Sequence, residues 1–141
     1  MRLSPFFQIG GKSLLKPPML ARVQTDGSYR HAQRLSRTAV IIGKEHKLVK
    51  VYPDGEHANS TESEWASVLD GLLFSHSTSH GAVELENDNQ GVIRSLYFSE
   101  AKKEMDSYYL HAILEQARTL EWVGVRWIPR ELNKADRLFR L

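Results

Sequence analysis

The 141-residue sequence contains no cysteine, which excludes a disulfide framework and any metal site built from thiolates. Its six histidines lack the spacing typical of zinc ligands. No apolar run approaches the ~20 residues needed to span a bilayer, and the first residues lack the apolar core of a signal peptide. With 41% hydrophobic and 26% charged residues, the composition predicts one ordinary cytoplasmic domain.

Positive charge is only slightly in excess, at a net +2, so overall charge does not itself indicate a nucleic-acid-binding protein. The basic residues are nevertheless unevenly placed. One cluster follows Asp26 and a second surrounds Asp136; they comprise Arg30, His31, Arg34 and Arg37, and then Arg126, Arg130, Lys134, Arg137 and Arg140. Runs of charge most often form a solvated surface. Flanking two acidic residues, these clusters also suit a polyanion lying across a metal site.

The chain is predicted to divide into an irregular N-terminal extension, residues 1–18, and a single domain, residues 19–141. Alternating and β-branched runs predict strands near residues 19–25, 38–43, 47–52, 82–87 and 123–127. Helical periodicity predicts helices near residues 62–76, 91–98, 105–120 and 133–141. The order β-β-β-α-β-α-α-β-α predicts an α/β fold. Its five-stranded mixed sheet has an antiparallel meander followed by parallel strands, flanked by helices.

Four carboxylates fall at predicted junctions between strands and helices: Asp26, Glu64, Asp88 and Asp136. Each has a simpler explanation. Asp26 suits an Asp-Gly turn, Glu64 suits a capping box begun by Thr61, and Asp88 and Asp136 suit helix caps. In combination they favour a site, because such junctions converge on one rim of a mixed sheet.

Carboxylates crowded on one rim would repel one another, and divalent cations remove that penalty. Oxygen ligands favour Mg²⁺ or Mn²⁺ over zinc. Two such ions about 4 Å apart can activate a water and stabilise the leaving oxygen of a phosphodiester. The residues therefore predict a phosphodiesterase site.

Four segments that contain these carboxylates resemble the type 1 ribonuclease H family, most closely its cellular and retroelement branch. They are Thr25-Asp26-Gly27-Ser28, Asn59-Ser60-Thr61-Glu62-Ser63-Glu64-Trp65, Glu86-Asn87-Asp88-Asn89-Gln90, and the stretch from Trp127 to Leu138. The last is the most specific, because it contains Trp-x-Pro-Arg-Glu-x-Asn followed by Ala-Asp. The resemblance extends from about residue 19 to the C-terminus.

The resemblance implies a ribonuclease H-like fold and two Mg²⁺ ions, replaceable by Mn²⁺, held by Asp26, Glu64, Asp88 and Asp136. It implies cleavage of the RNA strand of RNA–DNA hybrids to give 5′-phosphate and 3′-hydroxyl ends. The residues expected at the substrate are Gly27, Ser28, Asn59, Thr61, Asn89, Arg130 and Asn133. We expect a monomer that binds hybrids, beside a reverse transcriptase if the chain is part of a retroelement polyprotein.

The sequence departs from the family pattern in three ways. No histidine lies between Trp127 and Asp136, where many members carry one, so turnover is expected to be slow. Asn133 precedes Asp136 by one residue fewer than expected, and only Lys102 and Lys103 stand where some bacterial members carry a basic protrusion. Two alternatives stay open: a nuclease of this fold with another substrate, such as a junction resolvase or strand-transfer enzyme, and a weakly active hybrid-binding module.

Overall fold

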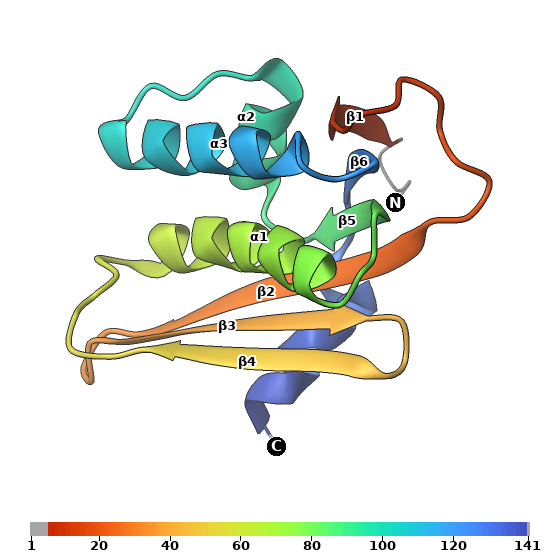
Figure 1. Ribbon diagram of the computed structural model, residues 1–141. Coiled ribbons are helices and arrows are strands. Elements are labelled where there is room, and N and C mark those ends of the chain that lie inside the picture. The colour runs from red at the N-terminus through yellow and green to blue at the C-terminus, as the bar shows by residue number, and fades with distance from the viewer. Residues whose placement is uncertain (1–5, 141) are drawn as a thin grey trace.

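The computed structural model describes residues 6–140, whose strands form one mixed six-stranded sheet flanked by helices (Figure 1). The strands are β1 (Phe7–Gly10), β2 (Ala21–Arg30), β3 (Leu35–Ile42), β4 (His46–Tyr52), β5 (Ala82–Asn87) and β6 (Trp122–Trp127). The α-helices are α1 (Ser60–Ser77), α2 (Gln90–Phe98) and α3 (Glu104–Ala117), and the 3₁₀-helices are η1 (Arg130–Leu132) and η2 (Lys134–Arg140). The predicted α/β class is confirmed.

The strands lie in the order β1-β6-β5-β2-β3-β4. β2, β3 and β4 form the predicted antiparallel meander. β5 pairs in parallel with β2, and β6 pairs in parallel with β5. The meander and the parallel pair therefore meet at β2, which has a neighbour of each kind.

The prediction of five strands was wrong, because the N-terminal segment expected to be irregular contributes β1. This strand pairs antiparallel with β6 at the edge of the sheet. Two glycines at its C-terminal end make the close approach possible: a Cβ at Gly10, the last residue of β1, would lie 2.8 Å from that of Ala117, and Gly11 has a φ of +121°. A double glycine that suggests a break in structure instead lets an edge strand pack tightly. Residues 1–5 of the predicted extension lie outside the described part of the chain.

β2 is also longer than predicted. It was expected to end near Thr25 and to be followed by a loop or strand edge at residues 30–37, yet it continues to Arg30. Its register with β3 runs from Val23↔Ile42 to Arg30↔Leu35. Asp26 therefore lies within a strand, and the reversal falls at residues 31–34, where Arg34 adopts a φ of 51°.

The C-terminal helix predicted after Asn133 is present as the 3₁₀-helix η2. Its Ala135 and Leu138 are buried against Ala39 of β3. Residues three apart lie on the same side of a 3₁₀-helix, so this spacing presents both side chains to the sheet. β3 alternates accordingly, with Val40 in the main core and Ala39 in this smaller cluster.

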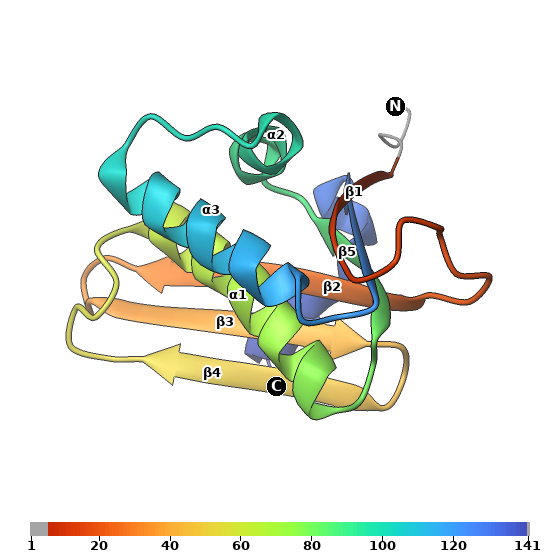
Figure 2. The same ribbon diagram turned by 45° about the horizontal axis from the view of Figure 1, so that its top comes forward.

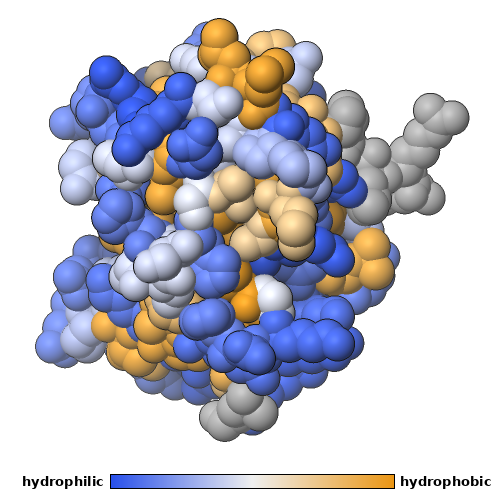
Figure 3. All heavy atoms as spheres, turned by 45° about the vertical axis from the view of Figure 1, so that its right-hand side comes forward, coloured by the Kyte–Doolittle hydropathy of each residue, from blue (hydrophilic) through white to orange (hydrophobic). Residues whose placement is uncertain are grey.

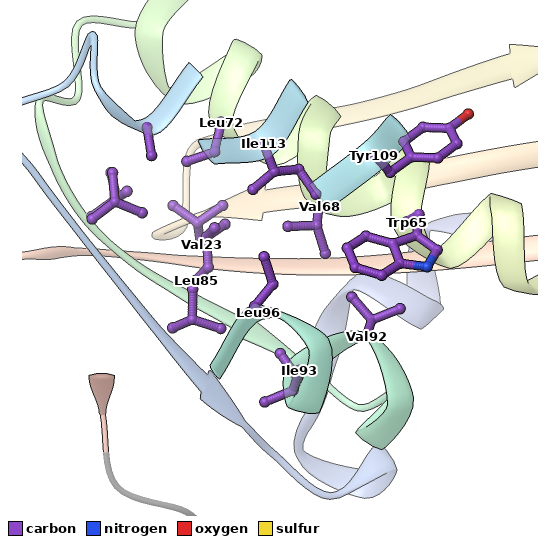
Figure 4. Packing of buried hydrophobic residues seen from close by; sticks show 14 of the residues in the cluster. Val23, Trp65, Val68, Leu72, Leu85, Val92, Ile93, Leu96, Tyr109 and Ile113 are labelled. Carbon is purple, nitrogen blue, oxygen red and sulfur yellow. The ribbon is translucent and has the colours of Figure 1, made fainter. Parts of the chain in front are cut away.

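The main core lies between the sheet and α1, and α3 packs on the far side of α1 (Figures 1 and 2). The predicted apolar stripe of α1 supplies Trp65, Val68 and Leu72, each at most 1% exposed. Figure 4 shows Val68 and Leu72 near Val23 of β2 and Ile113 of α3, and Trp65 near Val92 of α2 and Tyr109 of α3. Two other leucines of the predicted stripe are less buried: Leu69 is partly buried, and Leu73 is 43% exposed.

Hydrophilic residues cover most of the face drawn in Figure 3, and hydrophobic residues form separate patches on it. Within residues 6–140 no helix has both the length and the apolar character needed to cross a bilayer.

Leu72 and Leu73 offer a matched test of this packing. Leu72→Ala should lower the free energy of unfolding by about 2–5 kcal/mol, because its side chain is fully buried. Leu73→Ala should lower it by much less, because that side chain is partly in solvent. Urea denaturation of both variants measures the difference. Equal losses would contradict the described orientation of α1.

Candidate active site

Strand pairing brings Asp26 and Asp88 together. The parallel register of β2 and β5 aligns Gln24 with Glu86, and the amide of Gln24 donates to Glu86 Oε1 at 2.9 Å. Asp26 and Asp88 each follow these residues by two positions. Because side chains alternate along a strand, Asp26 lies on the same side of β2 as Gln24, and Asp88, the first residue after β5, lies close to it.

Glu64 joins them because α1 begins very close to β2. A Cβ at Gly27 would lie 2.5 Å from the carbonyl carbon and oxygen of Ser63, so only glycine allows this approach. The Gly27 N–H donates to Glu64 Oε1 at 2.5 Å and to Asp26 Oδ1 at 3.1 Å. Asp26 and Gly27 therefore lie where β2 contacts α1, and their interpretation as a turn was wrong.

The helix caps are made by other residues than these carboxylates. Asn59 caps α1 by accepting from the Glu62 N–H at 2.9 Å. Asn89 caps α2 by accepting from the Val92 N–H at 3.0 Å. The capping explanations for Glu64 and Asp88 are therefore wrong, and both side chains remain available to the site.

Carboxylate oxygens of Asp26, Glu64 and Asp88 all lie within 4.8 Å of one another. They line a hollow of about 480 Å³ whose other lining residues are Gly27, Ser28, Ser60, Asn89, Arg130 and Asp136. Asp136 thus shares the hollow, and its carboxylate accepts a hydrogen bond from the Arg140 guanidinium. All four predicted carboxylates meet at one place, with Asp136 at the edge of the cluster.

Burial and mutual repulsion raise the pKa values of these carboxyl groups. Burial, followed by the charge of Asp88, raises the pKa of Asp26 to about 7. Burial, followed by the charge of Asp26, raises the pKa of Glu64 to about 9. Burial also raises the pKa of Asp88, although the nearby Arg130 counteracts it. The cluster therefore favours either bound protons or bound cations near neutral pH.

The donor set fits a hard divalent cation. Three carboxylates with convergent oxygens are ligands that Mg²⁺ and Mn²⁺ prefer. Asp136, in the same hollow, is the further residue that could complete the set.

Three polar side chains hold the backbone around the site. Asn87 and Asn133 both donate to the carbonyl oxygen of Thr25, at 3.0 and 2.9 Å, and the Trp127 indole donates to the carbonyl oxygen of Asp88 at 2.9 Å. No role was predicted for Asn87, and only a core position was predicted for Trp127. Their places inside the recognised segments were the available signal.

The predicted substrate residues divide into two groups. Gly27, Ser28, Asn89 and Arg130 line the hollow. The others do not line it: Asn59 caps α1, Thr61 is exposed beside it, and Asn133 is buried. Their contacts with substrate stay predictions. Ser60 lines the hollow and was missed, although it lies between two residues that were singled out.

The basic clusters contribute less to the hollow than their sequence positions suggested. Arg130 lines it, and Arg140 pairs with Asp136. Arg37 instead lies over the Phe139 ring, 4.8 Å from its centroid, and donates to the Phe139 carbonyl oxygen at 3.2 Å. Its guanidinium therefore secures η2 to β3.

The fold and the carboxylate cluster together define a ribonuclease H-like domain. Among solved structures, the chain is similar to RNase H1 from the halophilic archaeon Halobacterium salinarum, with 16% identity, a TM-score of 0.74, and coverage of 85% of this chain and 94% of that one. It is also similar to the N-terminal RNase H domain of Rv2228c from Mycobacterium tuberculosis, with 15% identity, a TM-score of 0.73, and coverage of 84% and 88%. At these identities the likeness shows the fold.

The model of the reverse transcriptase-like family matches residues 24–138. The chain therefore belongs to this family of ribonuclease H-like domains. The predicted family and the predicted ribonuclease H-like fold are confirmed. Comparison with curated proteins finds no match.

The raised pKa values predict how pH changes the stability of the metal-free protein. In the unfolded chain these groups have ordinary pKa values of 3.8 for Asp26 and 4.5 for Glu64, against about 7 and about 9 when folded. Their protonation favours the folded state below the ordinary values, and this contribution is lost as pH rises through the folded values. With EDTA, the Tm contribution of the cluster should therefore fall between about pH 4 and pH 9.

Thermal unfolding across this range measures the effect, and Asp26→Asn isolates it because the variant lacks one interacting charge. The variant should show a flatter decline than the wild type, and Mg²⁺ at pH 8 should raise the wild-type Tm. Parallel pH profiles for the two proteins would contradict the pKa assignment.

Proposed function

We propose that this chain is a metal-dependent endoribonuclease that cuts the RNA strand of RNA–DNA hybrids and leaves 5′-phosphate and 3′-hydroxyl ends. The observation that carries the proposal is the cluster of Asp26, Glu64 and Asp88 within 4.8 Å, in a hollow shared with Asp136. The family match and the two similar ribonuclease H structures support the same chemistry.

In this proposal the four carboxylates hold two Mg²⁺ ions, with Mn²⁺ as a substitute. When bound, such ions supply an activated water and stabilise the leaving oxygen of the phosphodiester. The chain keeps the carboxylates in place: the Gly27 N–H binds Glu64, and the Trp127 indole holds the backbone at Asp88. This fixed arrangement supplies negative charge at a spacing that suits paired cations.

The polar lining of the hollow is proposed to bind the hybrid. Ser28, Ser60 and Asn89 present a hydroxyl or amide side chain at its wall, and such groups can sense the 2′-OH that separates RNA from DNA. Asn59 and Thr61, at the start of α1, would approach the minor groove of the hybrid, where that 2′-OH lies. Arg130, also at the wall, would contact a phosphate.

Turnover is expected to be slow in Mg²⁺. The segment from Trp127 to Asp136 contains no histidine, so the side chain that assists proton transfer or product release in many relatives is missing. Mn²⁺ should partly compensate, because it lowers the pKa of bound water more than Mg²⁺ does. The family's reverse transcriptase-like character supports a retroelement setting, and we propose that the domain acts as a monomer.

Asp88→Asn tests the catalytic role most directly. The change keeps the shape of the side chain and removes one negative charge from the cluster, so Mg²⁺-supported cleavage should fall by orders of magnitude. Hybrid binding should survive or strengthen, because less negative charge faces the phosphates. Cleavage of a labelled hybrid and gel-shift binding in EDTA measure the two effects.

Asp54→Asn is the matched control. Asp54 is an exposed turn residue with a φ of 56°, a conformation that asparagine adopts readily, so its cleavage rate should equal that of the wild type. Similar cleavage rates for Asp88→Asn and the wild type would falsify the role assigned to Asp88. Circular dichroism of both variants checks that each is folded.

The substrate is tested by offering labelled hybrid, duplex DNA and duplex RNA, each with Mg²⁺, Mn²⁺ or EDTA. Cleavage restricted to the RNA strand of the hybrid and abolished by EDTA is the expected result. Cleavage of DNA would favour a resolvase or strand-transfer enzyme. Hybrid binding without cleavage in either metal would favour a binding module.

A further inference from the structure

A chain of buried hydroxyl groups connects His57 to the start of α1. His57 Nδ1 lies 2.7 Å from Ser36 Oγ, and Ser36 Oγ lies 2.5 Å from Ser63 Oγ. Ser63 Oγ in turn donates to the carbonyl oxygen of Ser28 at 3.0 Å. His57 is 5% exposed, and Ser36 and Ser63 are completely buried. This series of hydrogen bonds therefore connects the loop before α1 with β3, α1 and β2.

The Ser28 carbonyl oxygen at the end of this series determines which group donates in each hydrogen bond. A carbonyl oxygen only accepts, so the single hydroxyl proton of Ser63 points to Ser28. Ser36 must then donate its proton to Ser63 Oγ, and it can only accept from His57. All three contacts are satisfied together only when His57 carries its proton on Nδ1. When the His57 ring is neutral, Nε2 is therefore the nitrogen without a proton.

The last link of the chain lies directly beside the carboxylate cluster. Ser63 and Glu64 are consecutive in α1, and Gly27 and Ser28 are consecutive in β2. Ser63 binds the carbonyl oxygen of Ser28, while the Gly27 N–H binds Glu64. Two adjacent hydrogen bonds thus hold the first turn of α1 against β2, and the first of them depends on His57.

The His57 ring is itself fixed. It stacks on Tyr52, with ring centroids 4.1 Å apart and an interplanar angle of 30°. The Tyr52 hydroxyl donates to Asp70 Oδ2 at 2.7 Å, further along α1. A ring secured on one face and at Nδ1 can hold the hydroxyl chain in one arrangement.

We propose that His57 is a positioning residue for Glu64, acting through Ser36 and Ser63. It fixes where the Glu64 carboxylate lies relative to Asp26 and Asp88, and so sets the affinity of the cluster for divalent cations. The inference rests on the proposed function insofar as it concerns metal binding and cleavage.

The first test needs neither metal nor substrate. Nitrogen chemical shifts of the neutral His57 ring in the wild-type protein should show the proton on Nδ1; a proton on Nε2 would overturn the proposal. In addition, Ser36→Ala should increase amide hydrogen exchange at Gly27, whose N–H binds Glu64. Unchanged exchange at Gly27 would also overturn it.

The second test compares variants by Mn²⁺ titration calorimetry and by hybrid cleavage. His57→Phe keeps an aromatic ring on Tyr52 but removes the donor, and it should weaken Mn²⁺ binding about tenfold, as Ser36→Ala should. The double variant should lose no more than either single variant, because both interrupt the same chain. His57→Asn, whose amide can still donate, should recover most of the affinity. Cleavage should lose kcat, with little change in KM.

Ser75→Ala is the matched control. Ser75 is also a fully buried serine of α1, and its hydroxyl donates to the Gly71 carbonyl oxygen at 2.7 Å, away from the cluster. It should lower the Tm by a similar amount and leave Mn²⁺ affinity unchanged. If His57→Phe behaves like this control, the positioning role is wrong.

The two proposals fail separately. A wild-type protein that binds Mn²⁺ but cuts no hybrid overturns the proposed substrate, and weaker Mn²⁺ binding by His57→Phe would still support the positioning role. A wild-type protein that binds no Mn²⁺ overturns the metal-dependent function. In that case exchange at Gly27 decides whether His57 positions Glu64.

Discussion

The approach of α1 to β2 at Gly27 is the contact on which the carboxylate cluster depends. Asp26 and Asp88 are placed mainly by the sheet, because the parallel register of β2 and β5 brings their backbones side by side and the Trp127 indole holds the backbone at Asp88. Glu64 is different, since it comes from a helix that packs on the sheet. It reaches the same place only because Gly27 has no side chain and offers its N–H to the carboxylate. Any Cβ at this position would push the helix, and Glu64 with it, away.

Holding these carboxylates together costs free energy unless something neutralises them. Burial and repulsion raise the pKa values of Asp26 and Glu64, so the empty cluster destabilises the fold as its protons leave. The scaffold tolerates this because the core lies elsewhere, between α1, α3 and the sheet, where Leu72 and Ile113 are completely buried. Cation binding would then recover free energy that the fold gives up in assembling the site.

The sequence predicted the convergence of the four carboxylates better than it predicted the strands. Asp26 was correctly placed with the other carboxylates although the Asp-Gly pair was taken for a turn, because both readings bring the residue to the same sheet. The edge strand Phe7–Gly10 was missed because a four-residue strand that ends in the first of two glycines carries too little pattern. Ser60 and His57 were missed for another reason. Ser60 lines the hollow although only its neighbours Asn59 and Thr61 were predicted at the substrate, and the contact of His57 with Ser36, 21 residues away, leaves no pattern in the local sequence.

The C-terminal segment is located by the same part of β2. The amide of Gln24 donates to Glu86 of β5 and to the carbonyl oxygen of Leu132, at 2.9 and 3.2 Å, and its oxygen accepts from the Lys134 N–H at 2.9 Å. One buried side chain thus fixes β5 on one side and the segment that carries Asp136 on the other. The other carboxylates are also positioned relative to β2. One short length of this strand therefore sets the distances between the carboxylates. None of the four carboxylates lies within α2 or α3, so those two helices contribute to the core and not directly to the cluster.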